Sequence, residues 1–289
     1  MIKVCFVILH YNTIEITRKC IASIQKLEEQ DKIAAVIVDN ASPDGTGKVL
    51  ADQYRENDRI KVILRETNDG FSAGNNEGCA FAMTEWNPEF LVVANNDIEF
   101  CQADFVRKIE QEYKNSSFDI LGPDICNPKT GNHQSPISVN PPGMRRVNKT
   151  IFLNQCALGL YPVIYPAIKK YFSRHIRKGQ AVRPLDYQED VCLLGACFIF
   201  SRKCIMEKAV VFQPETKFYY EEFILTSWCR RHGRKIVYQP KLQVWHQEGK
   251  ATETTGNCLK EQFRFLMENI LNAAKVYREF LREKGNVEE

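Results

Sequence analysis

The sequence predicts an α/β domain with a mostly parallel central sheet flanked by helices. Three observations lead to this prediction. Apolar strand segments alternate with helical segments over the first 125 residues, two of those strands end directly in Asp or Asn, and a glycine-rich segment opens a helix. Such alternation favours a parallel sheet with helices on both faces. With 289 residues, of which 44% are apolar and 26% charged, the chain can build a sizeable core in one large or two small domains.

Four strands are expected in the first part of the chain, because each segment is a short apolar run bounded by polar residues. They cover residues 3–9, 34–38, 60–64 and 90–94. Thr13 is positioned to cap the first helix, and its apolar face repeats at helical spacing. That face consists of Ile16, Cys20, Ile24 and Leu27. Further helices are expected from about Ser72 and after Asp104.

Strand signals return in the second half of the chain, at residues 196–200, 236–238 and 242–245. The last helix is expected over residues 258–281, because one face is apolar throughout. That face comprises Phe263, Met267, Ile270, Ala274, Tyr277 and Leu281. We expect this helix to pack on its own domain or to pair with a second copy in a homodimer.

The middle of the chain, residues 125–185, contains no Asp or Glu. In its second half, residues 151–176, aromatic and aliphatic residues are interleaved with Lys and Arg, a composition that suits an anionic membrane surface because bases attract anionic lipid. The segment therefore predicts peripheral membrane association, with a lipid-linked or acidic acceptor at the membrane face, and the alternative is a solvated insertion.

Composition excludes several other classes of protein. The net charge of +3 is too small to indicate nucleic-acid binding, and no apolar run reaches the length of a membrane span. Eleven cysteines without Cys-x-x-Cys spacing suit free thiols in a reducing compartment, so we expect a cytoplasmic protein without a zinc site.

Polar residues follow two of the predicted strands directly. Asp39 and Asn40 end one strand, and Asn95, Asn96 and Asp97 end another. Ligands of α/β proteins gather beyond the carboxyl ends of the strands, so these residues predict a binding corner. The alternative is a pair of polar turns, since Asn and Asp favour turns.

Three other patterns could carry chemistry. The glycine-rich segment 68–78 allows close approach of backbone to a ligand, although a lone glycine loop is a weak signal. Glu221 and Glu222 lie in a first helical turn after aromatic residues, where burial raises a carboxyl pKa and the helix dipole lowers it. They predict a general base or, alternatively, a surface complement to the dipole. His246 ends the last strand.

Taken in order, these segments resemble glycosyltransferase family 2, whose members have the GT-A fold. The resemblance covers residues 4–249 and looks most like the branch of rhamnosyltransferase-type enzymes. The motifs that carry it are Ile8-Leu9-His10-Tyr11-Asn12, Val38-Asp39-Asn40-Ala41-Ser42-Pro43-Asp44-Gly45, Gly70-Phe71-Ser72-Ala73-Gly74-Asn75-Asn76, Asn95-Asn96-Asp97, Gly195-Ala196-Cys197-Phe198, Tyr220-Glu221-Glu222 and His246.

The resemblance implies a role for each matched residue. Asp39 is expected at the nucleoside and Asn95 at the ribose. Asp97 is expected to bind Mg²⁺ or Mn²⁺, with His246 completing the metal site, and Glu222 is the expected catalytic base with Glu221 beside it. The other expected nucleotide-sugar-binding residues are Asn12, Asn40, Gly74, Asn75 and Asn96. Two departures matter: the family's Asp-x-Asp is Asn-Asn-Asp here, and its Glu-Asp pair is Glu-Glu.

The implied activity is inverting transfer of a sugar from a UDP- or dTDP-sugar to a hydroxyl of a glycan or lipid-linked saccharide, in bacterial surface polysaccharide synthesis at the inner face of the membrane. Residues 1–124 would form the nucleotide-sugar-binding half and 186–255 the acceptor half. Residues 125–185 would be the insertion and 256–289 the C-terminal helix. The alternatives are a catalytically inactive nucleotide-sugar binder and a sugar-1-phosphate nucleotidylyltransferase.

Overall fold

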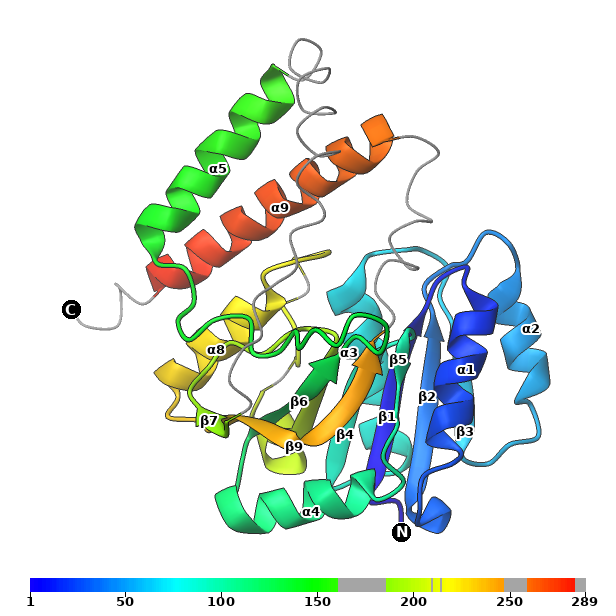
Figure 1. Ribbon diagram of the computed structural model, residues 1–289. Helices are drawn as coiled ribbons and strands as arrows, with labels where there is room; N and C mark the ends of the chain where they lie inside the picture. Colours follow the sequence, from blue (N-terminus) through cyan, green and yellow to red (C-terminus); the bar gives the residue numbers. More distant parts are fainter. Residues whose placement is uncertain (161–185, 209, 214, 247–258, 284–289) are drawn as a thin grey trace.

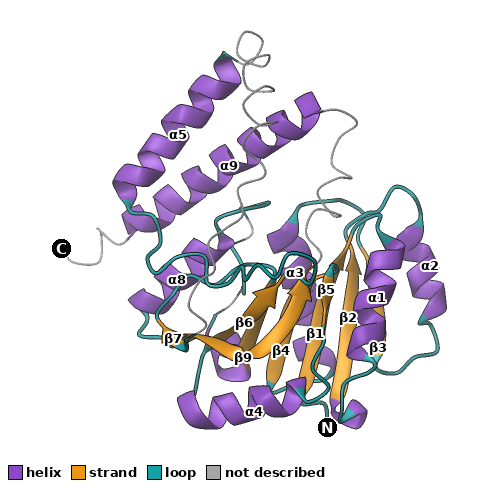
Figure 2. Ribbon diagram, in the orientation of Figure 1, coloured by secondary structure: helices purple, strands orange, loops and turns teal. Residues whose placement is uncertain are grey.

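A mixed sheet of nine strands forms the centre of the computed structural model (Figure 1), which describes residues 1–160, 186–208, 210–213, 215–246 and 259–283. The strand order is β3-β2-β1-β4-β8-β6-β9-β5, and β7 pairs with β9. Helices cover both faces of the sheet (Figure 2), as the sequence predicts. The α/β prediction is confirmed.

The parallel half of the sheet contains the four strands predicted from the first part of the chain. They are β1 (Val4–His10), β2 (Ile33–Asp39), β3 (Ile60–Leu64) and β4 (Phe90–Asn95). β1 and β2 are almost entirely buried, because side chains on both faces of the sheet pack against helices. His10 pairs with Asp39 and Leu9 with Asn95, so the polar strand ends meet at one edge of the sheet.

Four helices accompany this half, together with a short 3₁₀ turn (Gln30–Lys32). They are α1 (Ile14–Ile24), α2 (Thr46–Gln53), α3 (Phe71–Glu85) and α4 (Phe105–Ser116). α3 approaches the sheet closely, because a Cβ on Gly78 would lie 2.5 Å from Val7 Cγ1 and 2.8 Å from Val38 Cγ2. Gly78 therefore permits the close packing of α3 against β1 and β2.

The second half of the sheet is mixed. Its strands are β5 (Ile98–Glu99), β6 (Ile120–Cys126), β7 (Gln188–Glu189), β8 (Cys197–Ser201) and β9 (Ile236–His246). β8 is antiparallel to both β4 and β6, whereas β6 and β9 are parallel. The helices of this half are α5 (Met144–Gly159), α7 (Arg202–Glu207), α8 (Glu221–Arg231) and α9 (Leu259–Arg282).

The structure corrects three details. The strands expected at 236–238 and 242–245 are one strand, β9, which continues through a register shift opposite Pro123 and Asp124. β6 and α5 were not predicted, because glycine and proline interrupt the first and the second begins directly after a stretch of proline and glycine. Thr13 is the N-cap of α1, but its hydroxyl makes no capping bond and donates instead to the Tyr11 carbonyl, 3.3 Å away.

The core has two layers, one on each face of the sheet, since alternate residues of each strand point to opposite faces. A third cluster lies beyond the strand ends, where α5, α8 and α9 meet. It contains Val147, Ile151, Ile224, Ala274 and Tyr277. The C-terminal helix therefore packs on its own chain, one of the two arrangements expected for it.

Two further observations bear on the sequence predictions. The ten cysteines of the described residues are free, and seven of them are buried. None of the described helices is both long and apolar enough to span a lipid bilayer. Residues 161–185, which hold much of the basic and aromatic segment, lie outside the described residues.

Candidate active site

A cavity of about 890 Å³ lies at the carboxyl edge of the parallel strands. It is lined from the ends of β1, β2 and β4, from the start of β8, from the end of β9, and from the helices α8 and α9. Six of the predicted site residues line it: Asn40, Asn95, Asn96, Glu221, Glu222 and His246. Residues more than 200 positions apart in the sequence therefore share one cavity.

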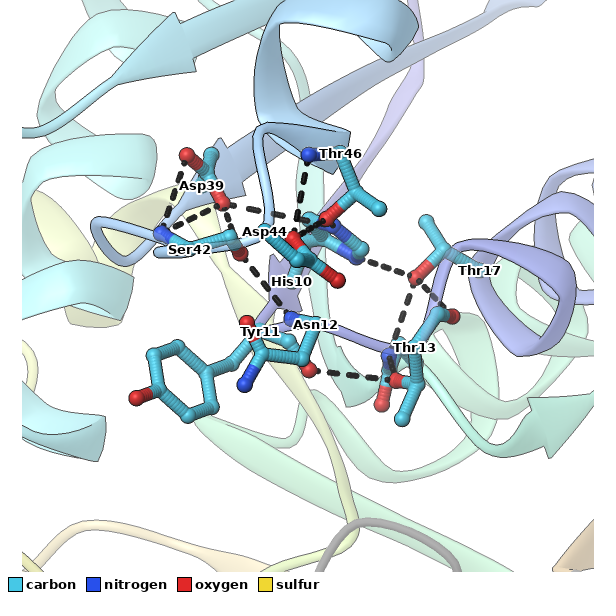
Figure 3. Close-up of polar contacts among 10 residues, drawn as sticks. His10, Tyr11, Asn12, Thr13, Thr17, Asp39, Ser42, Asp44 and Thr46 are labelled. Carbon is cyan, nitrogen blue, oxygen red and sulfur yellow. Dashed lines mark hydrogen bonds and ion pairs between the residues drawn. The ribbon is translucent and has the colours of Figure 1, made fainter. Parts of the chain in front are cut away.

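Asp39 is the last residue of β2 and is not among the residues that line the cavity. Its carboxylate accepts hydrogen bonds from the Ser42 hydroxyl and the Ser42 backbone N–H (Figure 3). The same hydroxyl oxygen accepts the Asn12 backbone N–H at 2.9 Å, so the turns after β1 and β2 are joined. The Asn12 side chain has a buried Oδ1 without a hydrogen-bond partner in the described part of the chain.

Asn40 holds the glycine-rich segment in place. Its Nδ2 donates to Asn68 Oδ1 at 2.7 Å and to the Gly70 carbonyl at 3.3 Å, while its Oδ1 accepts from Arg65 at 2.7 Å. Because both the nitrogen and the oxygen of this amide already have partners, Asn40 contributes mainly to the shape of the cavity wall and less to hydrogen bonding with a ligand. The positive φ of Gly70, +93°, lets the backbone approach Lys217.

Gly74 and Asn75 lie in α3 and do not line the cavity. A Cβ on Gly74 would collide with the Leu9 side chain, so this glycine permits the contact of α3 with β1. Asn75 is fully buried, and its Nδ2 donates to the Phe71 carbonyl at 3.0 Å. Asn75 Oδ1 is buried and has no hydrogen-bond partner among the described residues. The binding roles expected for Gly74 and Asn75 stay predictions.

The residues Asn95 and Asn96 have different surroundings. Asn96 is buried, and its Nδ2 donates to the hydroxyls of Thr13 at 2.7 Å and Thr17 at 2.9 Å. Asn95 lines the cavity, and its side chain makes no hydrogen bond with any described residue. Asn95 is therefore the amide of this strand end that is free to bind a ligand.

His10, at the end of β1, contacts the two neighbouring helices α1 and α2, a role that the sequence analysis did not predict. Its Nδ1 lies 2.7 Å from the Thr17 hydroxyl and its Nε2 2.9 Å from the Thr46 hydroxyl (Figure 3). Burial lowers the pKa of His10, and the carboxylates of Asp39 and Asp44 oppose that shift. The buried imidazole connects β1 to the first turns of α1 and α2.

Asp97 and His246 lie together, as predicted. His246 Nε2 is 3.2 Å from Asp97 Oδ1, and that buried oxygen has no hydrogen-bond partner in the described residues. His246 Nδ1 is fixed by Gln134 Oε1 at 2.7 Å. An unsatisfied carboxylate oxygen beside an oriented imidazole suits a shared cation. Within the described ranges, no group of three or more His, Cys, Asp or Glu side chains could hold a metal ion.

Glu221 and Glu222 open α8 and face the cavity. The Gly195 backbone N–H donates to Glu222 Oε1 at 3.3 Å, and a Cβ on Gly195 would lie 2.8 Å from that oxygen. Burial and the charge of Glu222 raise the pKa of Glu221 to about 8. Burial also raises the pKa of Glu222, opposed by its backbone hydrogen bonds. The Gly195 N–H stabilises the charged form of Glu222 and so opposes the effect of burial on its pKa.

The backbone leading to these carboxyl groups is strained. Tyr219 and Tyr220 have φ of +72° and +69°, a left-handed conformation that costs non-glycine residues roughly 1–3 kcal/mol each. The Tyr220 ring compensates by packing against Phe223 and Tyr277, with centroid distances of 5.3 and 5.6 Å. This packing holds Glu221 and Glu222 at the cavity.

One wall of the cavity was not predicted. α9 contributes Phe265, Glu268, Asn269 and Asn272, and the segment before α8 contributes Phe218. The Phe218 and Phe265 rings lie 5.4 Å apart, and Asn272 Nδ2 donates to the Glu215 carbonyl at 2.8 Å. No motif marks these residues, since only the docking of α9 brings them to the site.

We expect the Glu221→Gln variant to be more stable than the wild type above pH 4.5. Between about pH 4.5 and 8 the folded protein binds more protons at Glu221 than the unfolded chain does, because its folded pKa is raised. The wild type should lose up to about 1.4 kcal/mol of unfolding free energy per pH unit in this window relative to the variant. Urea unfolding at several pH values measures the difference.

Glu15→Gln is the matched control, since Glu15 is an exposed acid in the first turn of α1. It should reproduce the pH dependence of the wild type. A wild-type stability that rises relative to Glu221→Gln from pH 5 to 8 would contradict a protonated, buried Glu221.

Comparisons with known proteins agree with this architecture. The family model "Glycosyl transferase family 2" matches residues 5–205, and "Glycosyltransferase like family 2" matches residues 145–267. A Haloferax volcanii protein, the low-salt glycan biosynthesis hexosyltransferase Agl10, is 25% identical over 209 residues. That match covers 72% of this chain and 56% of the relative, so the chain spans about half of that protein's length.

Solved structures of S. aureus TarS share the fold. The structure of TarS residues 1–349 with UDP-GlcNAc aligns with a TM-score of 0.55 at 14% identity, covering 88% of this chain and 62% of that one. The complex with UDP aligns with a TM-score of 0.55 at 13% identity, covering 93% and 70%. The longer TarS structure aligns with a TM-score of 0.54 at 16% identity, covering 85% and 36%. The expected GT-A type of α/β fold is confirmed.

Proposed function

Because the chain belongs to glycosyl transferase family 2, we propose that it transfers a sugar from a nucleoside diphosphate sugar to a hydroxyl of a saccharide acceptor. One observation carries the proposal. The same cavity is lined by polar residues at the carboxyl ends of the parallel strands and by Glu221 and Glu222, two carboxyl groups whose pKa values are raised. Binding and proton transfer can therefore occur at adjacent positions.

Glu222 is the proposed general base. The acceptor hydroxyl gives its proton to Glu222 as its oxygen bonds to the anomeric carbon, and the bond from that carbon to the diphosphate oxygen breaks with its electron pair. Attack opposite the leaving group inverts the anomeric configuration. Glu221 is largely protonated at neutral pH because its pKa is raised, so it adds no second negative charge beside the attacking oxygen.

The donor is proposed to lie along the carboxyl edge of the sheet. Tyr11 and Asn95 line this part of the cavity, where they could contact the base and the ribose, and the Asp39 turn lies beside it. TarS structures with UDP and UDP-GlcNAc support a UDP-sugar donor, and a dTDP-sugar is the other proposed class. The rhamnosyl specificity expected from the sequence stays a prediction.

Asp97 and His246 would hold Mg²⁺ or Mn²⁺ with the diphosphate. The unsatisfied Asp97 oxygen and the oriented imidazole fit such a cation, whose other ligands would come from phosphate and water. When bound, the cation supplies charge neutralisation at the leaving diphosphate. Gln134 positions His246 by accepting its Nδ1 hydrogen bond.

The acceptor is proposed to enter beside α9. The rings of Phe218 and Phe265 form an apolar wall, and Glu268 and Asn272 place polar groups next to it. Aromatic faces with polar side chains around them suit the apolar face and hydroxyls of a sugar ring. A glycan or lipid-linked saccharide is therefore the proposed acceptor, in line with the glycan biosynthesis named for the Haloferax relative.

A ligand screen tests the proposal. UDP, dTDP, GDP and the corresponding nucleotide sugars should be added with Mn²⁺, and unfolding temperature and nucleoside diphosphate release measured. One donor at 100 times its Kd should stabilise the protein by about 2.7 kcal/mol. Release of diphosphate supports the transferase, whereas binding without release under every acceptor condition would favour the inactive binder. No binding of any nucleotide would overturn the proposal.

A further inference from the structure

The outer surface of α5 combines apolar and basic side chains. Phe152, Leu153 and Leu160 are 64%, 52% and 55% exposed, although each is a large hydrophobic residue. They lie at or next to the C-terminal half of the helix. Three large apolar side chains exposed on one helix indicate a surface that meets an apolar phase or a partner.

Basic residues occupy the same surface of the helix. Arg145, Arg146 and Lys149 are exposed, and none of them forms an ion pair with another described residue. α5 contains no Asp or Glu, and its opposite face, with Val147 and Ile151, is buried against α9. The surface formed by Arg145, Arg146, Lys149, Phe152, Leu153 and Leu160 is called the α5 face below.

We propose that the α5 face docks on a lipid bilayer that contains anionic lipid. The bases would attract the headgroups while Phe152 and the leucines enter the acyl boundary, the arrangement of an interfacial amphipathic helix. A second copy is the less suitable occupant, because a twofold contact would bring the same three bases together. Nucleic acid would leave the exposed phenyl and leucine side chains without an apolar environment.

The position of α5 relates this docking to the acceptor. This step of the argument rests on the proposed function. α5 and α9 lie side by side beyond the carboxyl ends of the strands (Figure 1). α9 packs against α5 through the cluster that contains Ala274 and Tyr277, and other residues of α9 line the cavity. A bilayer on the α5 face would thus lie near the acceptor wall, within reach of a saccharide on a lipid carrier.

Flotation of the full chain with vesicles tests the proposal. Vesicles of phosphatidylcholine alone are compared with vesicles of phosphatidylcholine and phosphatidylglycerol in equal parts. We expect binding to the mixed vesicles that weakens with salt. The double variant Lys149→Glu with Phe152→Ser should reduce the partition coefficient at least about tenfold, since each base near an anionic surface contributes about fivefold.

The matched control is Lys203→Glu with Met206→Ser on α7, an exposed base and an exposed apolar residue at the same spacing on another helix. This variant should float like the wild type. Equal losses in both variants, or no binding to mixed vesicles, would overturn the proposal, and so would a dimer that the α5 variant dissociates. Diphosphate release from the donor is measured alongside, so a failure of vesicle binding is distinguishable from a failure of the proposed transfer.

Discussion

The Glu222→Gln variant is expected to transfer sugar about 10²–10⁴ times more slowly than the wild type, with donor affinity nearly unchanged. Glutamine keeps the size of the side chain and its contact with the Gly195 N–H but cannot take a proton. The acceptor hydroxyl would then have to lose its proton to water. Initial rates at saturating donor and acceptor, together with donor titration by calorimetry, measure the two parts of this prediction.

Glu221→Gln is the matched comparison, because it removes a carboxyl group one position away in the same helical turn. Since the raised pKa of Glu221 keeps this group largely protonated at pH 7, its loss should cost much less activity than that of Glu222. The wild-type rate should rise with pH through the raised pKa of Glu222, as the base becomes deprotonated. Near-normal activity in Glu222→Gln, or a greater loss in Glu221→Gln, would remove Glu222 from the role of base.

The Asp97→Asn variant is expected to lose about 100-fold or more in kcat/KM for the donor. The change removes one negative charge and leaves the volume of the side chain intact. Because the neighbouring strand-end residues are amides, no other carboxylate of that strand end can replace Asp97 at a cation. Mn²⁺ binding in the presence of the nucleoside diphosphate, followed by electron paramagnetic resonance, gives a readout that does not depend on turnover.

Asn96→Asp is the informative companion variant. Asn96 is buried and donates to Thr13 and Thr17, so an acid there should destabilise the fold without tightening Mn²⁺ binding. Wild-type Mn²⁺ affinity in Asp97→Asn would contradict the assignment of Asp97. If Gln134→Ala also weakens Mn²⁺ binding, the orienting hydrogen bond to His246 contributes to the same site.

The parallel half of the sheet is predictable from the sequence because its strands are buried on both faces. Such strands are continuous apolar runs, and β1, β2 and β4 have that pattern. β6 contains Gly122 and Pro123, and β9 contains Pro240, residues that interrupt an apolar run. These residues predict breaks in the strands, and for that reason β6 was not predicted and β9 was predicted as two strands. In the folded protein, pairing with strands distant in sequence keeps both strands extended.

The residues of the candidate site likewise fall into those that the sequence predicts and those that it does not. Strand-end residues such as Asn95 and Asp97 could be predicted, since the topology of a parallel sheet brings strand ends together. The role of Gly74 was harder to assign, because a glycine needed for packing and one needed at a ligand look alike in sequence. Phe265 and Asn272 could not be found at all, since their contribution depends on how α9 docks.

The anomeric configuration of the product tests the central claim most directly. Transfer from the donor identified by ligand screening can be followed by proton NMR, which reports the configuration of the newly formed glycosidic bond. Direct displacement by a hydroxyl activated at Glu222 predicts a product whose anomeric configuration is opposite to that of the donor. A product that retains the configuration of the donor would contradict a single displacement with Glu222 as its base.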